Sequence, residues 1–322
     1  MHARLRRVLP GSVLLLILPL LAAAWLAAAP PARGDAEDAI PLVEELIANV
    51  ESLALPVLVE RTLVRPLERM LSSLERGKEK VALVQLRLFE HLAHLLLALE
   101  LLDEEIAEAA LESAHVIRVA IAPGPPPLLQ NLAVAFAPWD PVTDLAGDFV
   151  FVAAEEKVFL EFGAVVDTPD GPKPLPTFEY RLAPDAVVVS PIDGAVEAIA
   201  FDSETNDYEI RLLASPLSPF LVVVDHVTDP LVAEGDAVAA GQWLGLPGTF
   251  SATLGRTELQ LVNFVERRSY CPLALADPAL AADLDADVSG LMDDWETFQG
   301  DAALYDQAAM VLPGCLTDSL AE

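Results

Sequence analysis

Basic residues are scarce in this 322-residue sequence, which has 19 Lys and Arg against 50 Asp and Glu and a formal net charge of −31. Nucleic acids and anionic membrane surfaces are bound by neutralising their phosphates, so this charge balance argues against both as partners. Aromatic residues make up only 6%, which argues against a base-stacking surface. Hydrophobic residues make up 53%, so the chain is not disordered as a whole and can form the cores of roughly two domains.

Long apolar runs are confined to the N-terminus. Arg4, Arg6 and Arg7 precede an apolar run from Val13 to Ala29, and Ala32-Arg33-Gly34 follows it. This pattern predicts a cleaved secretory signal peptide over residues 1–34, with a retained membrane anchor as the alternative. Later helical stretches carry charges every few residues, so we expect no stable membrane span after cleavage. The expected location is secreted or periplasmic.

Cysteine is nearly absent. In an exported protein, Cys271 and Cys315 most simply form a disulfide, worth about 4 kcal/mol if it acts by restricting the unfolded chain. A metal site built on these cysteines would need further ligands, and no His follows His226. We therefore predict that the disulfide ties down a C-terminal extension, residues 266–322. A short helix in this extension is expected to dock through Trp295, Phe298 and Tyr305.

Residues 36–121 predict an antiparallel bundle of about four helices, because apolar residues recur every three or four positions. Gly77 indicates the end of a helix and Asp103 the start of another, while Pro56 and Pro66 are expected to interrupt the first part. The predicted buried stripes are Leu42, Leu46, Val50 and Leu53; Leu63, Leu67, Met70 and Leu74; Val81, Val84, Leu88, Leu92, Leu95 and Leu99; and Ile106, Ala110, Ala114 and Ile117.

This helical stretch resembles the FIMAH module of exported bacterial proteins. The resemblance rests on the segments Leu46–Leu53, Leu74–Gly77 and Leu88–Leu92, and it implies an accessory or interaction module without chemistry. His91 and His94, with Glu90, have a spacing that can hold a metal from one helix face. The alternative interpretation, a solvated polar edge, is favoured because only His115 offers a further imidazole nearby.

A Pro-rich linker, residues 122–148, separates the bundle from a β-domain over residues 149–265. Many short strands without intervening helices indicate an all-β barrel or sandwich, so the predicted fold class is α+β with several domains. The predicted strands are Phe149–Val152, Val158–Phe162, Ala186–Val189, Ala195–Phe201, Tyr208–Leu213, Phe220–Val227 and Leu259–Phe264.

Two segments of this domain, Val189–Val196 and Val232–Gly245, pair turn glycines with core valines. They resemble two families with duplicated hairpins. A biotinyl or lipoyl carrier is excluded because no Lys follows Lys173 to accept the group. From about Leu175 to Phe264 the order of turns and strands resembles the lysostaphin-like (LytM-type) zinc endopeptidases, which cleave cell-wall peptides.

The resemblance implies zinc ligands at a His-x-x-x-Asp pair and at the second His of a His-x-His strand. In this sequence Leu175 and Glu179 stand at the first two positions, and Glu258-Leu259-Gln260 replaces the His-x-His strand. His226 keeps the middle-strand histidine. Because Leu cannot ligate and Gln is a poor zinc ligand, we predict neither a metal cofactor nor catalytic residues of the family type.

What remains is a groove with Glu179, His226, Glu258 and Gln260 on its floor, and Arg256 and Asn263 as further polar candidates. These residues either bind a ligand or are structural hydrogen-bonding partners. A Glu179–Glu258 pair would support acid–base work only if burial separated the two pKa values. We predict an exported, non-catalytic pseudo-peptidase that binds or scaffolds a protein, or a cell-wall peptide or glycan. The alternative is an active metallohydrolase with an altered ligand set.

Overall fold

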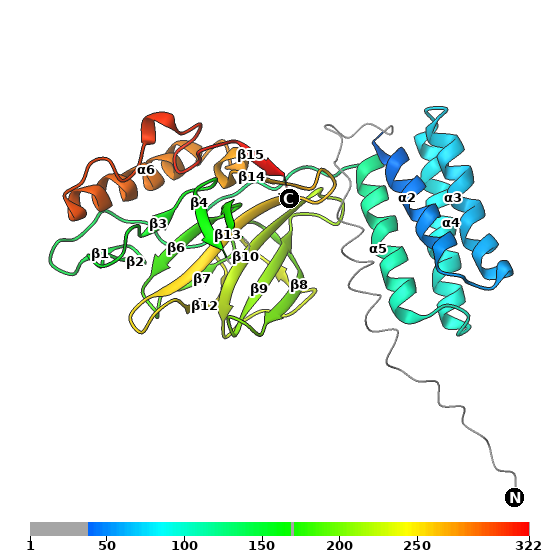
Figure 1. Ribbon diagram of the computed structural model, residues 1–322, viewed down its shortest axis with the longest axis horizontal. Helices are drawn as coiled ribbons and strands as arrows, with labels where there is room; N and C mark the ends of the chain where they lie inside the picture. The colour runs from blue at the N-terminus through cyan, green and yellow to red at the C-terminus, as the bar shows by residue number, and fades with distance from the viewer. Residues whose placement is uncertain (1–37, 169–170, 322) are drawn as a thin grey trace, which may run out of the picture.

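The computed structural model describes residues 38–168 and 171–321, so the predicted signal peptide lies outside the described residues. A bundle of four helices lies beside a strongly curled antiparallel sheet, and a C-terminal helix covers one end of the sheet (Figure 1). The expected architecture, a helical bundle followed by an all-β domain with a disulfide-tied extension, is confirmed.

The helices begin and end at the signals expected from the sequence. Asp103 caps the last bundle helix by accepting a hydrogen bond from the Glu105 backbone, and Gly77 has φ +62°, which glycine tolerates, just after the second helix. The bundle helices are α2 Ala39–Ser52, α3 Val57–Leu74, α4 Glu79–Ala98 and α5 Glu104–Ile121.

Two expectations for the bundle were wrong. Pro66 does not interrupt the chain but lies buried inside α3, where packing offsets its missing N–H. The predicted stripe of α4 faces outward, and a different side of the helix is buried. That buried side consists of Ala82, Leu86, Phe89, Ala93 and Leu96. Its two alanines let neighbouring helices approach closely around Phe89, and periodicity cannot distinguish two faces that are both apolar.

The strands pair almost entirely antiparallel, and within the described part of the chain thirteen of them belong to one sheet. The main path through this sheet runs β1-β2-β6-β13-β12-β10-β9-β8-β11, and β4 and β5 form a separate hairpin. The strands are β1 Leu145–Ala146, β2 Phe149–Val150, β3 Phe159–Leu160, β4 Val165–Thr168, β5 Gly171–Pro174, β6 Phe178–Leu182, β7 Val188–Val189, β8 Gly194–Asp202, β9 Asp207–Leu213, β10 Phe220–Thr228, β11 Ala237–Val238, β12 Trp243–Thr249, β13 Gly255–Asn263, β14 Arg268–Tyr270 and β15 Ser319–Ala321.

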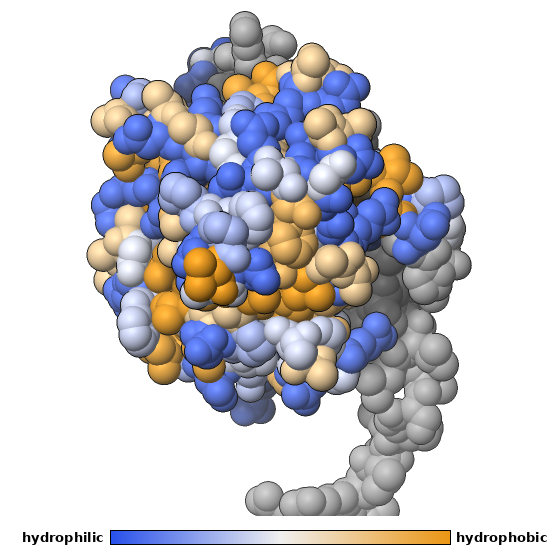
Figure 2. Space-filling view, turned by 90° about the vertical axis from the view of Figure 1, so that its left-hand side faces the viewer, coloured by the Kyte–Doolittle hydropathy of each residue, from blue (hydrophilic) through white to orange (hydrophobic). Residues whose placement is uncertain are grey.

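The C-terminal extension packs onto the sheet through the predicted aromatic residues, but its helix is longer than expected and ends at Gln299, so Tyr305 lies beyond it. Helix α6 (Ala281–Gln299) places Trp295 edge-on to Phe151 at 5.0 Å, and the hydroxyl of Tyr305 donates to the backbone of Phe159. The Cys271–Cys315 disulfide is confirmed, and β15 extends the sheet beside β14. Figure 2 looks at the end of the molecule formed by α6 and β1–β3, where hydrophobic residues gather in the lower half of the view.

Four neighbouring strands, β6, β13, β10 and β9, position the candidate site. Their inward side chains, such as Tyr180, Val224 and Leu259, are fully buried in the core of the sheet domain. Because side chains alternate along a strand, the residues between them share the opposite face. Register places Glu179 opposite Glu258, and Glu258 is in turn paired with Asp225. Three acidic residues from three strands are thus brought into one row.

Candidate functional site

The candidate site is centred on His226, near the end of β10. The pairing of β10 with β9 is irregular between Val224 and Val227, and His226 adopts a left-handed backbone conformation with φ +55°. Such a conformation is unfavourable for a residue with a side chain, so the surroundings must hold it in place. The irregularity turns the imidazole into the acidic row, where His226 is only 6% exposed.

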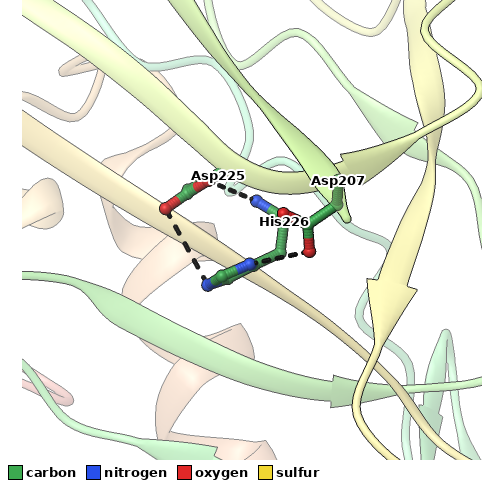
Figure 3. Close-up of side chains that lie close together, drawn as sticks. All are labelled: Asp207, Asp225 and His226. Carbon is green, nitrogen blue, oxygen red and sulfur yellow. Dashed lines mark hydrogen bonds and ion pairs between the residues drawn. The ribbon is translucent and has the colours of Figure 1, made fainter. Parts of the chain in front are cut away.

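The imidazole of His226 lies between carboxylates on both of its nitrogens (Figure 3). Its Nδ1 is 2.9 Å from Oδ2 of Asp207, the first residue of β9. Its Nε2 is 3.4 Å from Oε1 of Glu258 and 3.8 Å from Oδ2 of Asp225. Carboxylate oxygens face both ring nitrogens and favour the doubly protonated imidazolium, although the guanidinium of Arg256, 3.2 Å from Nδ1, opposes that charge.

Two arginines neutralise the rest of the acidic row. Arg181 forms an ion pair with Glu179, and its guanidinium lies 3.7 Å above the ring of Phe250. Arg256 lies between the two halves of the site, with Nη1 3.9 Å from Glu179 Oε1 and Nη2 3.2 Å from His226 Nδ1. Each charged side chain of this network therefore has an opposite charge close by.

The electrostatics of the pair formed by His226 and Glu258 favour charge on both. Burial and the nearby charge of Arg256 lower the pKa of His226. The hydrogen bond to Glu258 and the charges of Asp225 and Glu258 outweigh them and raise that pKa above 6.5. Burial opposes ionisation of Glu258 as well. The hydrogen bond to His226 and that histidine's charge nevertheless hold the pKa of Glu258 below its usual value.

The pKa of Asp225 shifts in the opposite direction to that of Glu258. Its burial raises its pKa above the ordinary value, more than the nearby His226 lowers it. Of the three carboxylates near the imidazole, Asp225 is also the most distant and the most exposed, with 31% of its side chain accessible. Asp225 is thus the member of the row best placed to respond to a ligand or to solvent.

The structure brings together three of the four residues predicted for the groove. Glu179, His226 and Glu258 are linked through Arg256 and the β6–β13 register. Gln260 lies on the same strand as Glu258 but donates to Ser269 on β14, away from the imidazole. Of the two further polar candidates, Arg256 contacts His226, whereas the side chain of Asn263 accepts from the Val265 and Glu266 backbone.

Asp207 was missed by the sequence analysis. It lies 19 residues before His226 and reaches the imidazole only because β9 pairs with β10. Gly248 makes room for this contact, since a Cβ there would lie 2.5 Å from Asp207 Oδ2 and 3.0 Å from His226 Cβ. The sequence signal available was a single Asp beginning a strand after a polar turn, which is common and points to no partner.

The zinc site implied by the family resemblance does not fit these residues. Leu175, at the position of the first ligand, is an almost fully buried apolar side chain. Glu179 is engaged by Arg181, and Gln260 is engaged by Ser269. Three ligating atoms are needed for a zinc that keeps an open position for water, and these positions do not supply them.

A different set, Asp207, Asp225 and His226, has ligand atoms within 4.8 Å of one another. The two carboxylates, however, contact opposite nitrogens of the same ring, as Figure 3 shows, so a single ion cannot replace both contacts without rearrangement. The guanidinium of Arg256, 3.2 Å from Nδ1, would also repel a cation. The observed geometry is that of an ion-pair network and favours retention of a proton over binding of a metal.

No protein-family model and no curated protein matches this chain. Several solved structures are similar to parts of it. Lysostaphin shares 16% identity over 33% of this chain and 44% of its own, with a TM-score of 0.27. Csd3 of Helicobacter pylori shares 13% identity over 55% of this chain and 45% of its own, with a TM-score of 0.33. A zinc-containing peptidase from Vibrio cholerae shares 16% identity over 43% of this chain and 38% of its own, with a TM-score of 0.30.

The chain thus spans less than half of each of these three proteins. At these TM-scores the likeness carries no site residues or activity across to this chain. What the site can do is therefore argued from its own side chains. The FIMAH resemblance of the bundle stays a prediction.

Proposed function

We propose that this protein is an exported, non-catalytic binding or scaffolding protein whose sheet domain is a pseudo-peptidase. The observation that carries the proposal is the position of Arg256 between Glu179 and His226. A guanidinium there is a fixed cation 3.2 Å from a ring nitrogen of His226, and it disfavours a metal ion bound at that nitrogen. The imidazole is also enclosed between carboxylates, an arrangement that stabilises a fold but presents no metal-activated water.

The Cys271–Cys315 disulfide supports an extracytoplasmic location, because structural disulfides persist in oxidising compartments. The partner we propose is a protein, or a peptide or glycan of the cell wall. It would contact the site through Arg256, whose side chain is 25% exposed and can offer a charge-assisted donor to a carboxylate or carbonyl. Nucleic acid is disfavoured by the net charge of −31.

The test combines metal analysis, wall digestion and wall binding with the purified protein. After equilibration with zinc and desalting, we expect far less than one zinc per chain and no soluble fragments released from insoluble peptidoglycan. We expect binding to peptidoglycan, measured by co-sedimentation, to weaken in Arg256→Ala. Arg61→Ala, which removes an exposed arginine from α3, is the matched control and should bind as the unaltered protein does.

The second candidate, an active metallohydrolase, is favoured by one observation, the grouping of Asp207, Asp225 and His226. It predicts stoichiometric zinc that is lost in Asp207→Asn and in His226→Gln, together with wall digestion that is lost in the same variants. That combination would replace the pseudo-peptidase proposal. The purified protein could also hold no zinc and neither digest nor bind the wall. That result would leave the scaffolding of another protein as the remaining form of the proposal, which cross-linking from position 256 would test.

A further inference from the structure

Helix α4 has two apolar faces, and only one of them is used by the bundle. The buried face packs against α3 and α5. The other face carries a line of exposed residues, which we call the α4 stripe. Its members and their exposed fractions are Val81 47%, Val84 59%, Leu88 40%, Leu95 45% and Leu99 57%, with the partly buried Leu92 between them.

The spacing of three and four residues keeps the α4 stripe on one side of the helix along its whole length. Helices α3 and α4 lie on the side of the bundle farthest from the sheet (Figure 1), and the exposed fractions of the stripe show that the described residues leave this face open. Scattered exposed apolar residues are ordinary, but a continuous line of large ones along a helix is a feature of contact surfaces.

We propose that the α4 stripe pairs with the α4 stripe of a second copy of this chain, with the two helices antiparallel. A symmetric contact of this kind requires a surface that matches its own reverse. The α4 stripe is nearly symmetric in sequence about position 90. Val81 and Leu99 are each nine residues from that position, and Leu88 and Leu92 are each two residues from it. Val84 and Leu95 match to within one residue.

The charges at the two ends of the α4 stripe favour antiparallel over parallel pairing, and they favour a second copy of this chain as the partner. Lys78, Glu79 and Lys80 are exposed at its N-terminal end and together carry a net positive charge. Glu100, Asp103 and Glu104 are exposed at its C-terminal end, and Lys80 and Glu100 are each ten residues from position 90. Antiparallel pairing therefore places each basic end against the partner's acidic end, whereas parallel pairing would place like charges together.

A lipid bilayer is a poorer occupant of the same face. By length and composition α4 is the one helix, within the described ranges, that passes for a membrane span, which is weak evidence by itself. Its other face is committed to the bundle core through Leu86 and Phe89, both fully buried, so insertion would require the bundle to open. The net charge of −31 would also repel an anionic bilayer surface.

The experiment is sedimentation equilibrium over micromolar to millimolar protein, with both the full chain and the chain beginning at Asp35. A single helix-on-helix contact is small, so we expect a weak, reversible monomer–dimer equilibrium in both forms. Leu88→Glu and Leu95→Glu should weaken dimerisation at least tenfold. Leu58→Glu, at an α3 leucine that is 79% exposed and outside the stripe, should leave it unchanged.

A charge reversal tests the direction of pairing. Lys80→Glu alone should weaken the dimer, and adding Glu100→Lys in the same chain should restore it, because each copy then carries the exchanged pair. Circular dichroism of every variant confirms that the bundle is folded.

Any one of four results would overturn the proposal. The first is a protein that stays monomeric over the whole concentration range, and the second is a dimer indifferent to Leu88→Glu and Leu95→Glu. The third is an association that depends on the stripe and occurs with the full chain but not with the chain beginning at Asp35. That result would assign the face to residues 1–34. Binding of the monomer to zwitterionic vesicles, lost in Leu88→Glu, would assign it to lipid instead. None of these readouts involves the sheet domain, so the inference stands or falls independently of the proposed function.

Discussion

Asp207 Oδ2 lies 2.9 Å from Nδ1 of His226, and both side chains are almost fully buried, at 1% and 7% exposed. The two residues come from the start of one strand and the end of the next, and their contact closes the polar row that also contains Glu258 and Arg256. Burying both partners excludes competing water, so this hydrogen bond is expected to matter more than a surface ion pair.

Replacement of Asp207 by Asn keeps the shape of the side chain and removes its charge. We expect the free energy of unfolding to fall by roughly 1–3 kcal/mol, because a charge-assisted hydrogen bond to a buried imidazole becomes a neutral one. Urea unfolding measures the change. Asp167→Asn, which alters an exposed aspartate on β4 of the same domain, is the comparison, and an equal loss there would argue against a special role for the Asp207–His226 contact.

The raised pKa of His226 predicts a stability contribution that depends on pH. Because the folded-state pKa lies above the ordinary value of 6.5, the contribution is complete below about pH 6.5 and is lost as the pH rises through the folded-state pKa. The difference in unfolding free energy between the unaltered protein and His226→Gln should therefore shrink from mildly acidic to mildly alkaline buffer. A difference that grew over this range would mean that the imidazole is buried in its neutral form.

Two neighbouring residues of α4 distinguish its buried face from its exposed stripe. Phe89→Ala should cost about 3–5 kcal/mol of unfolding free energy, because Phe89 is fully buried and its loss leaves a cavity. Leu88→Ala should cost less than about 0.5 kcal/mol in dilute protein, because Leu88 is 40% exposed. Thermal or chemical unfolding of both variants provides the check, and similar losses would indicate that α4 is rotated about its axis, with Leu88 turned toward the bundle core.

Two glycines are expected to respond in opposite ways to alanine. Gly248→Ala should destabilise the protein by about 1–3 kcal/mol, because the new methyl group would lie 2.5 Å from Asp207 Oδ2 and displace it from His226. It should also move the His226 titration seen by NMR. Gly290 lies inside α6 with open space around its Cβ position, so Gly290→Ala should stabilise by about 0.5–1 kcal/mol. Stabilisation by Gly248→Ala would contradict the packing of the site.

Local chemistry was sufficient to predict most of the fold. Asp103 and Gly77 mark helix boundaries because capping involves only a few adjacent residues. The β-branched run in Phe220–Val227 predicted β10, and two cysteines have only one intrachain pairing. The exposed face of α4 could not be predicted in the same way. Both faces of that helix are apolar, so the choice depends on the shape of its neighbours.

The sequence by itself determined that this is an acidic chain with a helical module, an all-β domain and a cross-linked tail, because periodicity, turn residues and composition act over short distances. It also determined that the ligand positions expected from the peptidase resemblance carry Leu175 and Gln260. Only the tertiary structure decided that Asp207 holds His226 and that Arg256 lies between His226 and Glu179. Those contacts join separate strands, and strand order and register arise from packing of the whole sheet.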